Sequence, residues 1–279
     1  ATLIALILGC AQLALSLSGT LGLASPVVLG LVVAVVVLIP VVRWVERRVR
    51  NPVLAPELFA RREFPLALLQ GFLIMLPRLG AVTAVGLYFQ GMHGDSAALA
   101  AIKTVTFPVL LTVGSLMGAR VRDLLSEWWA TVISASVAVV GMVAMLLSIV
   151  LGSDVLVIAG LGILGLGNGV FQTLNSSAIM TSAPAERAGV VNAIRTTGQS
   201  FGSGVGLAIA MALMMVFVSQ ADGAAFLAGN PSAVTADGQV AISLGFGLTY
   251  AVMLVLMLAG LALSWVRPGR DRSEEILDS

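Results

Sequence analysis

The stretch FLIMLPRLGAVTAVGLYF, from Phe72 to Phe89, decides the fold class of this chain. It has the length and the apolar composition of the inside of a membrane helix. Yet it contains Arg78 next to Pro77. A guanidinium stays charged in proteins, and placing one at the centre of a membrane helix costs about 2.5–3.5 kcal/mol on insertion scales. The rest of the sequence must therefore supply a reason or a partner for Arg78.

The composition of the whole chain indicates that lipid is its solvent. Of its 279 residues, 58% are hydrophobic and 10% are charged, whereas soluble domains are about half apolar and about a quarter charged. The formal net charge is +1, which provides no basic field for nucleic acid. Cys10 is the only cysteine and His93 the only histidine, so an intrachain disulfide, a cysteine-rich zinc site and a multi-histidine metal site are excluded.

Eight apolar runs are each long enough, at about 20 residues, to cross a bilayer. They are Thr2–Leu21, Pro26–Val45, Phe64–Gln90, Ala97–Ala119, Trp128–Leu151, Val155–Ser182, Gly189–Ser219 and Val240–Val266. The fold class predicted is therefore an all-α integral membrane protein with eight transmembrane helices.

The charges between the runs predict the orientation of the chain. Every second connection is rich in arginine, and together with the tail these segments hold 13 of the 15 basic residues. The other connections hold no basic residue and carry Asp95, Asp154, Asp222 and Asp237. The positive-inside rule then places both ends of the chain in the cytoplasm. All four tryptophans fall at the expected cytoplasmic helix ends, which fits one half of an aromatic belt.

Glycines recur inside the sixth and seventh runs. Gly165, Gly167 and Gly169 belong to the sixth run, and Gly202 and Gly206 to the seventh. A dinucleotide-binding loop needs a strand before it and a helix after it, so nucleotide binding is not expected here. Small residues allow helix backbones to approach closely. These glycines therefore predict tight helix packing in an interface that slides or rocks.

Three amides form a polar stripe along the sixth run. Asn168, Gln172 and Asn175 are spaced i, i+4 and i+7, which places them on one helix face. In hydrocarbon such a face must meet protein or a water-filled cavity. Two interpretations stay open: hydrogen bonds between helices, or the wall of a cavity that contacts substrate.

Arg78 and Lys103 are the only charges deep in the runs, and no Asp or Glu accompanies them there. Without a buried acid, and with a single histidine, no paired carboxylates or Ser-His dyad can be assembled. The chain is therefore not expected to be an enzyme. Both cations and the amide stripe are candidates for lining a substrate or ion pathway. Arg78 could instead bond backbone carbonyls and water, an acid from elsewhere in the protein, or an anionic substrate.

Two cytoplasmic turns carry charges of both signs. Arg120, Arg122 and Asp123 lie in one, and Glu186 and Arg187 in the other. Solvated charge pairs of this kind contribute about 0–1 kcal/mol each. The alternative is a cytoplasmic latch between helix bundles.

Three stretches resemble a known family. They are NPVLAPELFARREF (Asn51–Phe64), LYFQGMHGDSAALAA (Leu87–Ala101) and GLGNGVFQTLNSSAIMTSAPAERAGVVNAIRTTGQSFGSGVGLAI (Gly165–Ile209). In this order they resemble the C-terminal part of a major facilitator superfamily transporter, of the fourteen-helix drug:proton antiporter (EmrB/QacA-like) type. Pro108 stands where the next helix of that family has a proline, and we therefore predict a role in helix packing or gating for Pro108. The charged motif of the superfamily is degraded, with Gly118 at the position of its aspartate.

The resemblance implies a division of the chain. Residues 1–45 would be an extra transmembrane helix pair, 46–63 a cytoplasmic Arg-rich linker, 64–266 the C-terminal six-helix transporter bundle and 267–279 a cytoplasmic tail. An N-terminal six-helix bundle of the same protein would be missing. That bundle carries an intramembrane acid in this family, so proton coupling is expected to depend largely on it.

The function expected is secondary active export of a small lipophilic or amphipathic solute from the plasma (bacterial inner) membrane. The proton gradient would supply the energy, no cofactor or metal is expected, and the partners would be the lipid bilayer and the missing bundle, without nucleic acid. One alternative is an exporter of an anionic metabolite or lipid on the same fold. A second is a membrane scaffold or sensor domain that does not transport.

Overall fold

The computed structural model describes residues 6–7, 9–10, 13–14, 17, 25–46, 63–181 and 188–266, and within these residues the chain is helical without a strand. The elements are α2 (Pro26–Glu46), α4 (Glu63–His93), α5 (Ala97–Thr104), α6 (Thr106–Leu124), α7 (Glu127–Leu151), α8 (Asp154–Thr181), α9 (Ala188–Met215), α10 (Gln220–Leu227), the 3-10 turn η2 (Pro231–Ala233) and α11 (Ala236–Val266).

Six spans in the described part of the chain have the length and composition needed to cross a membrane. They are α4, α5 together with α6, α7, α8, α9 and α11. The prediction of an all-helical, multi-pass membrane protein is confirmed at this level. In α2 the apolar part runs only from Pro26 to Val42. Most of the run Thr2–Leu21, the linker and the tail lie outside the described residues, so the total of eight helices and the extra helix pair stay predictions.

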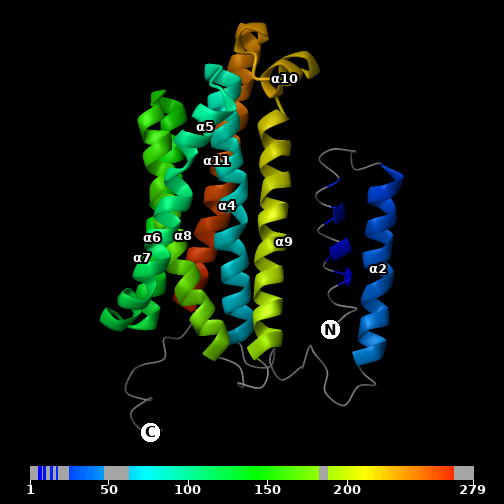
Figure 1. Cartoon of the computed structure of the whole chain (residues 1–279), viewed down its shortest axis with the longest axis vertical. Coiled ribbons are helices and arrows are strands. Elements are labelled where there is room, and N and C mark those ends of the chain that lie inside the picture. Colours follow the sequence, from blue (N-terminus) through cyan, green and yellow to red (C-terminus); the bar gives the residue numbers. More distant parts are fainter. Residues whose placement is uncertain are drawn as a thin grey trace.

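The six spans alternate in direction and form one bundle (Figure 1). α4 packs along α9, α8 packs against both α6 and α7, and α11 contacts α4, α7 and α9. We call the end with Arg120 and Arg122 the arginine-rich end, and the opposite end, with Asp95, Asp154 and Asp237, the acidic end. The short helix α10 and η2 lie at the acidic end, between α9 and α11 (Figure 1). α2 stands apart from the bundle, beyond α9 (Figure 1).

Local sequence signals define several helix ends. Ser96 and Ser126 cap α5 and α7, because their side-chain oxygens accept hydrogen bonds from the backbone N–H groups of Leu99 and Trp129. α7 ends at Gly152, which has a left-handed φ of 59° that suits glycine. The span after the acidic connection is split at Val105 into α5 and α6. Pro108 explains this break, because its ring removes a backbone donor and crowds the carbonyl four residues earlier.

Glycines allow α8 to approach two neighbours at once. A Cβ on Gly165 would lie 2.5 Å from the Phe107 carbonyl oxygen of α6, and one on Gly169 would overlap the Leu111 carbonyl. On another face, a Cβ on Gly167 would overlap the backbone of α7. Because lipid gives apolar helices no reason to associate, such close backbone contacts are a main source of packing energy in membranes.

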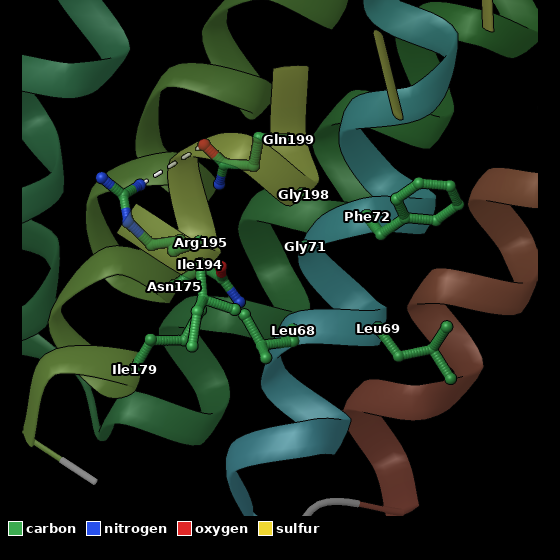
Figure 2. A pocket seen from close by; sticks show the side chains of 10 residues that line it. All are labelled: Leu68, Leu69, Gly71, Phe72, Asn175, Ile179, Ile194, Arg195, Gly198 and Gln199. Carbon is green, nitrogen blue, oxygen red and sulfur yellow. Dashed lines mark hydrogen bonds between the residues drawn. The ribbon is translucent and has the colours of Figure 1, made fainter. Parts of the chain in front are cut away.

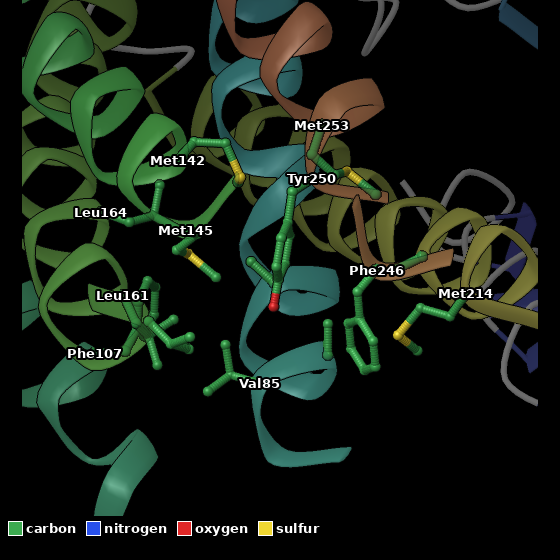
Figure 3. Packing of buried hydrophobic residues seen from close by; sticks show 14 of the residues in the cluster. Val85, Phe107, Met142, Met145, Leu161, Leu164, Met214, Phe246, Tyr250 and Met253 are labelled. Atoms are coloured by element: carbon green, nitrogen blue, oxygen red, sulfur yellow. The ribbon is translucent and has the colours of Figure 1, made fainter. Parts of the chain in front are cut away.

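The core lies between α4, α7, α8 and α11 and is rich in methionine and aromatic side chains (Figure 3). Met142, Met145 and Phe246 have no exposed surface, and Tyr250 is 1% exposed. Methionine is unbranched and polarisable, so it fills irregular gaps beside rings. The centre of this bundle is therefore filled mainly by apolar side chains.

Candidate functional site

Arg78 lies at the middle of α4 and faces α8. Its Nη1 atom donates a hydrogen bond to the Gln172 side-chain oxygen, 3.3 Å away, and both side chains are half-buried. Among the described residues no carboxylate forms an ion pair with Arg78. From the sequence we expected the partner of Arg78 to be a backbone carbonyl, water, an acid from elsewhere in the protein or an anionic substrate. The structure adds a neutral amide of the same chain, which leaves the positive charge uncompensated.

The rest of the amide stripe faces the inside of the bundle. Asn168 and Asn175 have no exposed surface. The Asn175 side-chain nitrogen donates to the Ala67 carbonyl oxygen at 2.9 Å, which is a bond between α8 and α4. Both polar atoms of Asn168 are buried without a partner in the described residues. Asn168 therefore needs a water or another hydrogen-bonding group, since an unpaired buried amide is costly.

Lys103 lies at the acidic end and not beside Arg78. Its Nζ atom is 2.5 Å from the Asp95 side-chain oxygen Oδ2 and 4.2 Å from the centre of the Phe89 ring. The carboxylate and the ring together neutralise and cover the ammonium. From the sequence we expected both Arg78 and Lys103 to lie deep without an acid beside them. The structure corrects this for Lys103, which pairs with Asp95, whereas Arg78 has no anionic partner among the described residues. That Lys103 lines the pathway stays a prediction.

The predicted glycine pair of α9 lies against α4. A Cβ on Gly206 would overlap the Leu76 carbonyl oxygen, and one on Gly202 would lie 3.0 Å from the Phe72 ring. The contact between α4 and α9 is thus a close backbone contact. Whether this interface slides or rocks during function stays a prediction.

The turn between α6 and α7 connects to α8. Arg122 donates to the Ser177 hydroxyl at 2.8 Å, while Arg120 is exposed. Asp123 makes an interaction of its own. Glu186 and Arg187 lie outside the described residues, so the predicted latch stays a prediction.

Sequence reasoning missed two polar clusters. At the acidic end, Asp154 lies 3.5 Å from His93 Nε2 and accepts a hydrogen bond from the Tyr88 hydroxyl at 3.3 Å. At the arginine-rich half, Arg195 bonds the side-chain oxygens of Asn192 and Gln199 and borders a pocket between α4, α8 and α9 (Figure 2). Asn192, Arg195 and Gln199 are spaced i, i+3 and i+7 along α9, and this spacing could have revealed the second cluster in the sequence. No group of three or more metal-ligating side chains occurs among the described residues.

The helical bundle, with its uncompensated arginine and buried amides, defines a multi-pass membrane protein that holds polar groups within the bilayer. The sequence matches the Major Facilitator Superfamily over residues 1–207, more than half of the chain. The chain belongs to this family, a family of membrane transporters and not of enzymes, and the family recognised in the sequence is confirmed.

Curated relatives have names that describe resistance or efflux. The Methylenomycin A resistance protein of Streptomyces coelicolor is 28% identical over 200 residues, which is 67% of this chain and 42% of the relative. The Multidrug transporter protein MdtP of Bacillus subtilis is 27% identical over 171 residues, 61% of this chain and 31% of the relative. The Multidrug efflux pump LfrA of Mycolicibacterium smegmatis is 24% identical over 242 residues, 78% and 48% respectively. The chain thus spans less than half the length of these relatives.

Proposed function

We propose that this chain is the C-terminal part of a secondary active exporter of the drug:proton antiporter type. It moves a lipophilic or amphipathic solute outward against inward proton flow by alternating access of a central cavity. Family membership and relatives named for multidrug and methylenomycin resistance support this proposal. These relatives extend well beyond the matched part, which fits a second bundle elsewhere in the same protein.

The observation that carries the proposal is the contact between Arg78 and Gln172. A charge at the centre of an apolar helix that bonds only a neutral amide remains available to an anionic group. That group is an acid of the other bundle or the cargo itself. Arg78 and Gln172 are half-buried, and we assign both to the wall of the central cavity. Asn168 and Asn175 have no exposed surface, so their place in this wall stays a prediction.

We assign residues 64–266 to the C-terminal bundle and residues 1–45 to the extra helix pair, with 46–63 as linker and 267–279 as tail. The isolated position of α2 beyond α9 supports the separate helix pair (Figure 1). The arginine-rich end lies on the cytoplasmic side of the bacterial inner membrane, because basic connections are retained on that side.

The orientation can be tested by labelling from outside the cell. Ser232 is exposed at the acidic end, and Cys10 is the only cysteine of this 279-residue sequence; any cysteine elsewhere in the protein would be replaced as well. In a Cys10→Ser background, Ser232→Cys should react with a membrane-impermeant maleimide on intact cells, and Arg120→Cys only after the cells are opened. The reverse pattern would contradict the assignment.

The function can be tested with the full-length protein in inverted vesicles. A pH gradient should drive uptake of a cationic dye or of an organic anion, and Arg78→Gln should lower the rate about tenfold or more, the loss expected when about 1.4 kcal/mol of interaction is removed. Leu79→Ala, a change at the exposed neighbour of Arg78, is the matched control. The proposal fails if neither cargo moves, and the site assignment fails if Arg78→Gln transports normally.

A second candidate function differs only in the cargo. Because Arg78 has no anionic partner in the described chain, the same cavity suits an anionic metabolite or lipid. Uptake of the organic anion without uptake of the dye would favour this candidate.

A further inference from the structure

A small pocket opens between α4, α8 and α9, in the half of the bundle near the arginine-rich end (Figure 2). Its volume is about 230 Å³. Leu68, Ile179 and Ile194 supply apolar lining, and Asn175, Arg195 and Gln199 supply polar lining. Whole drug-sized molecules usually occupy about 300–1,000 Å³, so this pocket has room for one end of a molecule.

Two polar atoms of the lining are buried without a partner in the described residues: the Asn175 side-chain oxygen and the Gln199 side-chain nitrogen. Their orientations are determined by the bonds of the other amide atom. The Asn175 nitrogen donates to the Ala67 carbonyl, and the Gln199 oxygen accepts from Arg195 at 3.4 Å. Neither atom has accessible surface, so neither faces the pocket directly, and both remain unpaired polar atoms with lost hydration in the described residues.

Arg195 adds a positive charge to this lining. It is half-buried, and its hydrogen bonds go to the neutral side-chain oxygens of Asn192, at 2.9 Å from Nη2, and of Gln199. No carboxylate forms an ion pair with it in the described part of the chain. A guanidinium has five donors in a planar fork that matches carboxylate and phosphate groups. Its unused donors therefore favour an anionic ligand.

The depth of Arg195 suits a molecule that is charged at one end. Arg195 is seven residues from the first residue of α9, Ala188, and at 1.5 Å per residue it lies about 10 Å inside the helix. At this rise the 28 residues of α9 span about 42 Å. In a hydrocarbon core of about 30 Å a centred α9 would place Arg195 just inside the boundary between head groups and acyl chains. A ligand whose charged head reaches Arg195 can keep its tail against the apolar lining and the lipid.

We propose that this pocket binds the head of an amphipathic anion. The anionic group contacts Arg195 at the edge of the pocket, and the apolar tail lies along Leu68, Ile179 and Ile194. Two sources provide this chemistry: a lipid such as phosphatidylglycerol, with a phosphate and hydroxyls, or a soluble N-acyl amino acid, with a carboxylate and an amide N–H.

Equilibrium dialysis of the full-length protein in phosphatidylcholine nanodiscs tests the site without requiring transport. The probe is N-dodecanoylglycine, and its uncharged methyl ester is the ligand control. Arg195→Gln should weaken binding of the acid about ten- to a hundredfold, as expected when hydrogen bonds to a charged group are lost, with little change for the ester. Equal affinity of the wild type for acid and ester would overturn the proposal.

A pocket-filling variant provides an independent test should Arg195→Gln fail to fold. A Cβ on Gly198, in the lining, or on Gly189, outside it, meets no atom within 4 Å. Gly198→Leu should therefore extend a side chain into the pocket and weaken acid and ester alike, whereas Gly189→Leu on the same helix should change neither. Unchanged binding of the acid to Gly198→Leu would also overturn the proposal.

Adding phosphatidylglycerol to the nanodiscs identifies the source of the ligand. If phosphatidylglycerol weakens binding of the acid to the wild type and this effect disappears in Gly198→Leu, the lipid is the natural occupant of the site. Unchanged binding supports the site with a soluble amphipathic anion.

Discussion

The Arg78 guanidinium on α4 donates a hydrogen bond to the Gln172 side-chain oxygen on α8, 3.3 Å away and 94 residues later in the chain. The contact joins two central helices through a charge that the amide cannot neutralise. Lys103 shows the contrast, since Asp95 neutralises it within 2.5 Å. Of these two cations, Lys103 is compensated within the chain, whereas Arg78 has no anionic partner among the described residues.

Replacing Gln172 tests how much this contact stabilises the bundle. Gln172→Leu should lower the free energy of unfolding by about 1.5 kcal/mol, the lower end for bonds to charged groups, because the bond is long. Thermal unfolding in a nonionic detergent would measure the loss. In the double variant with Arg78→Met the two losses should not add, since both remove one interaction. Additive losses would show that the contact contributes nothing.

Gly206 tests the close approach of α4 and α9. Gly206→Ala would drive a methyl group into the Leu76 carbonyl, and the resulting overpacking should destabilise the bundle by about 1–3 kcal/mol. Gly86→Ala on α4 is the control, because a Cβ there meets no atom within 4 Å. The yield of monodisperse protein and its melting temperature would report both changes. Equal behaviour of the two variants would contradict this packing.

The Lys103–Asp95 ion pair at the acidic end should contribute more to stability than the contact between His93 and Asp154, in which His93 is charged only when protonated. The side chains of His93 and Asp154 are 38% and 39% exposed, and Asp154→Asn should change stability by less than about 1 kcal/mol. The side chains of Lys103 and Asp95 are only 25% and 13% exposed. Asp95→Asn should therefore cost more, because it leaves a partly buried ammonium unpaired. Thermal unfolding of both variants at low and high salt would measure the two losses of stability. Equal losses would refute the predicted difference.

Asp222 should make the connection between α9 and α11 sensitive to acid. Hydrogen bonds from the Thr235 backbone N–H at 2.8 Å and the Ser219 hydroxyl at 2.7 Å hold the pKa of the Asp222 carboxyl below its usual value. A depressed pKa means that the stabilisation is fully present above the unfolded value of about 3.9 and is lost as the pH falls through the folded pKa.

Hydrogen exchange of residues 219–235 should measure this opening, which we expect only below about pH 4, near the unfolded pKa. Asp222→Asn keeps the shape of the side chain without its charge, and it should raise exchange already at neutral pH. Wild-type protection that is constant down to pH 2 would contradict the role of the carboxylate.

The sequence predicted the six spans well, because a run of apolar residues can satisfy its backbone in lipid only as a helix. It placed most ends within a few residues of the observed ones, but α9 ends at Met215 and not at Ser219. The intervening helix α10 was missed, although Ser219 and Asp222 have the i, i+3 spacing of a reciprocal helix cap. Its eight residues are too few to stand out as a separate helix beside the long spans.

The candidate site was only partly visible in the sequence. Helical spacing placed Asn168, Gln172 and Asn175 on one face, and their burial or half-burial agrees with a face turned toward protein. Arg195 was counted only among the charges that orient the chain, because its distance from the end of α9 depends on where the helix begins. The pocket around it requires three helices, which no local pattern specifies.

By itself, the amino-acid sequence determined the solvent, the helical class and the alternation of the connections, because these depend on the hydrophobicity and charge of single segments. Only the tertiary structure decided that Arg78 meets Gln172, that Lys103 meets Asp95 and that the Asn175 oxygen and Gln199 nitrogen are left unpaired. These outcomes depend on the rotation and separation of helices far apart in the chain, and close backbone contacts at glycines such as Gly206 set both.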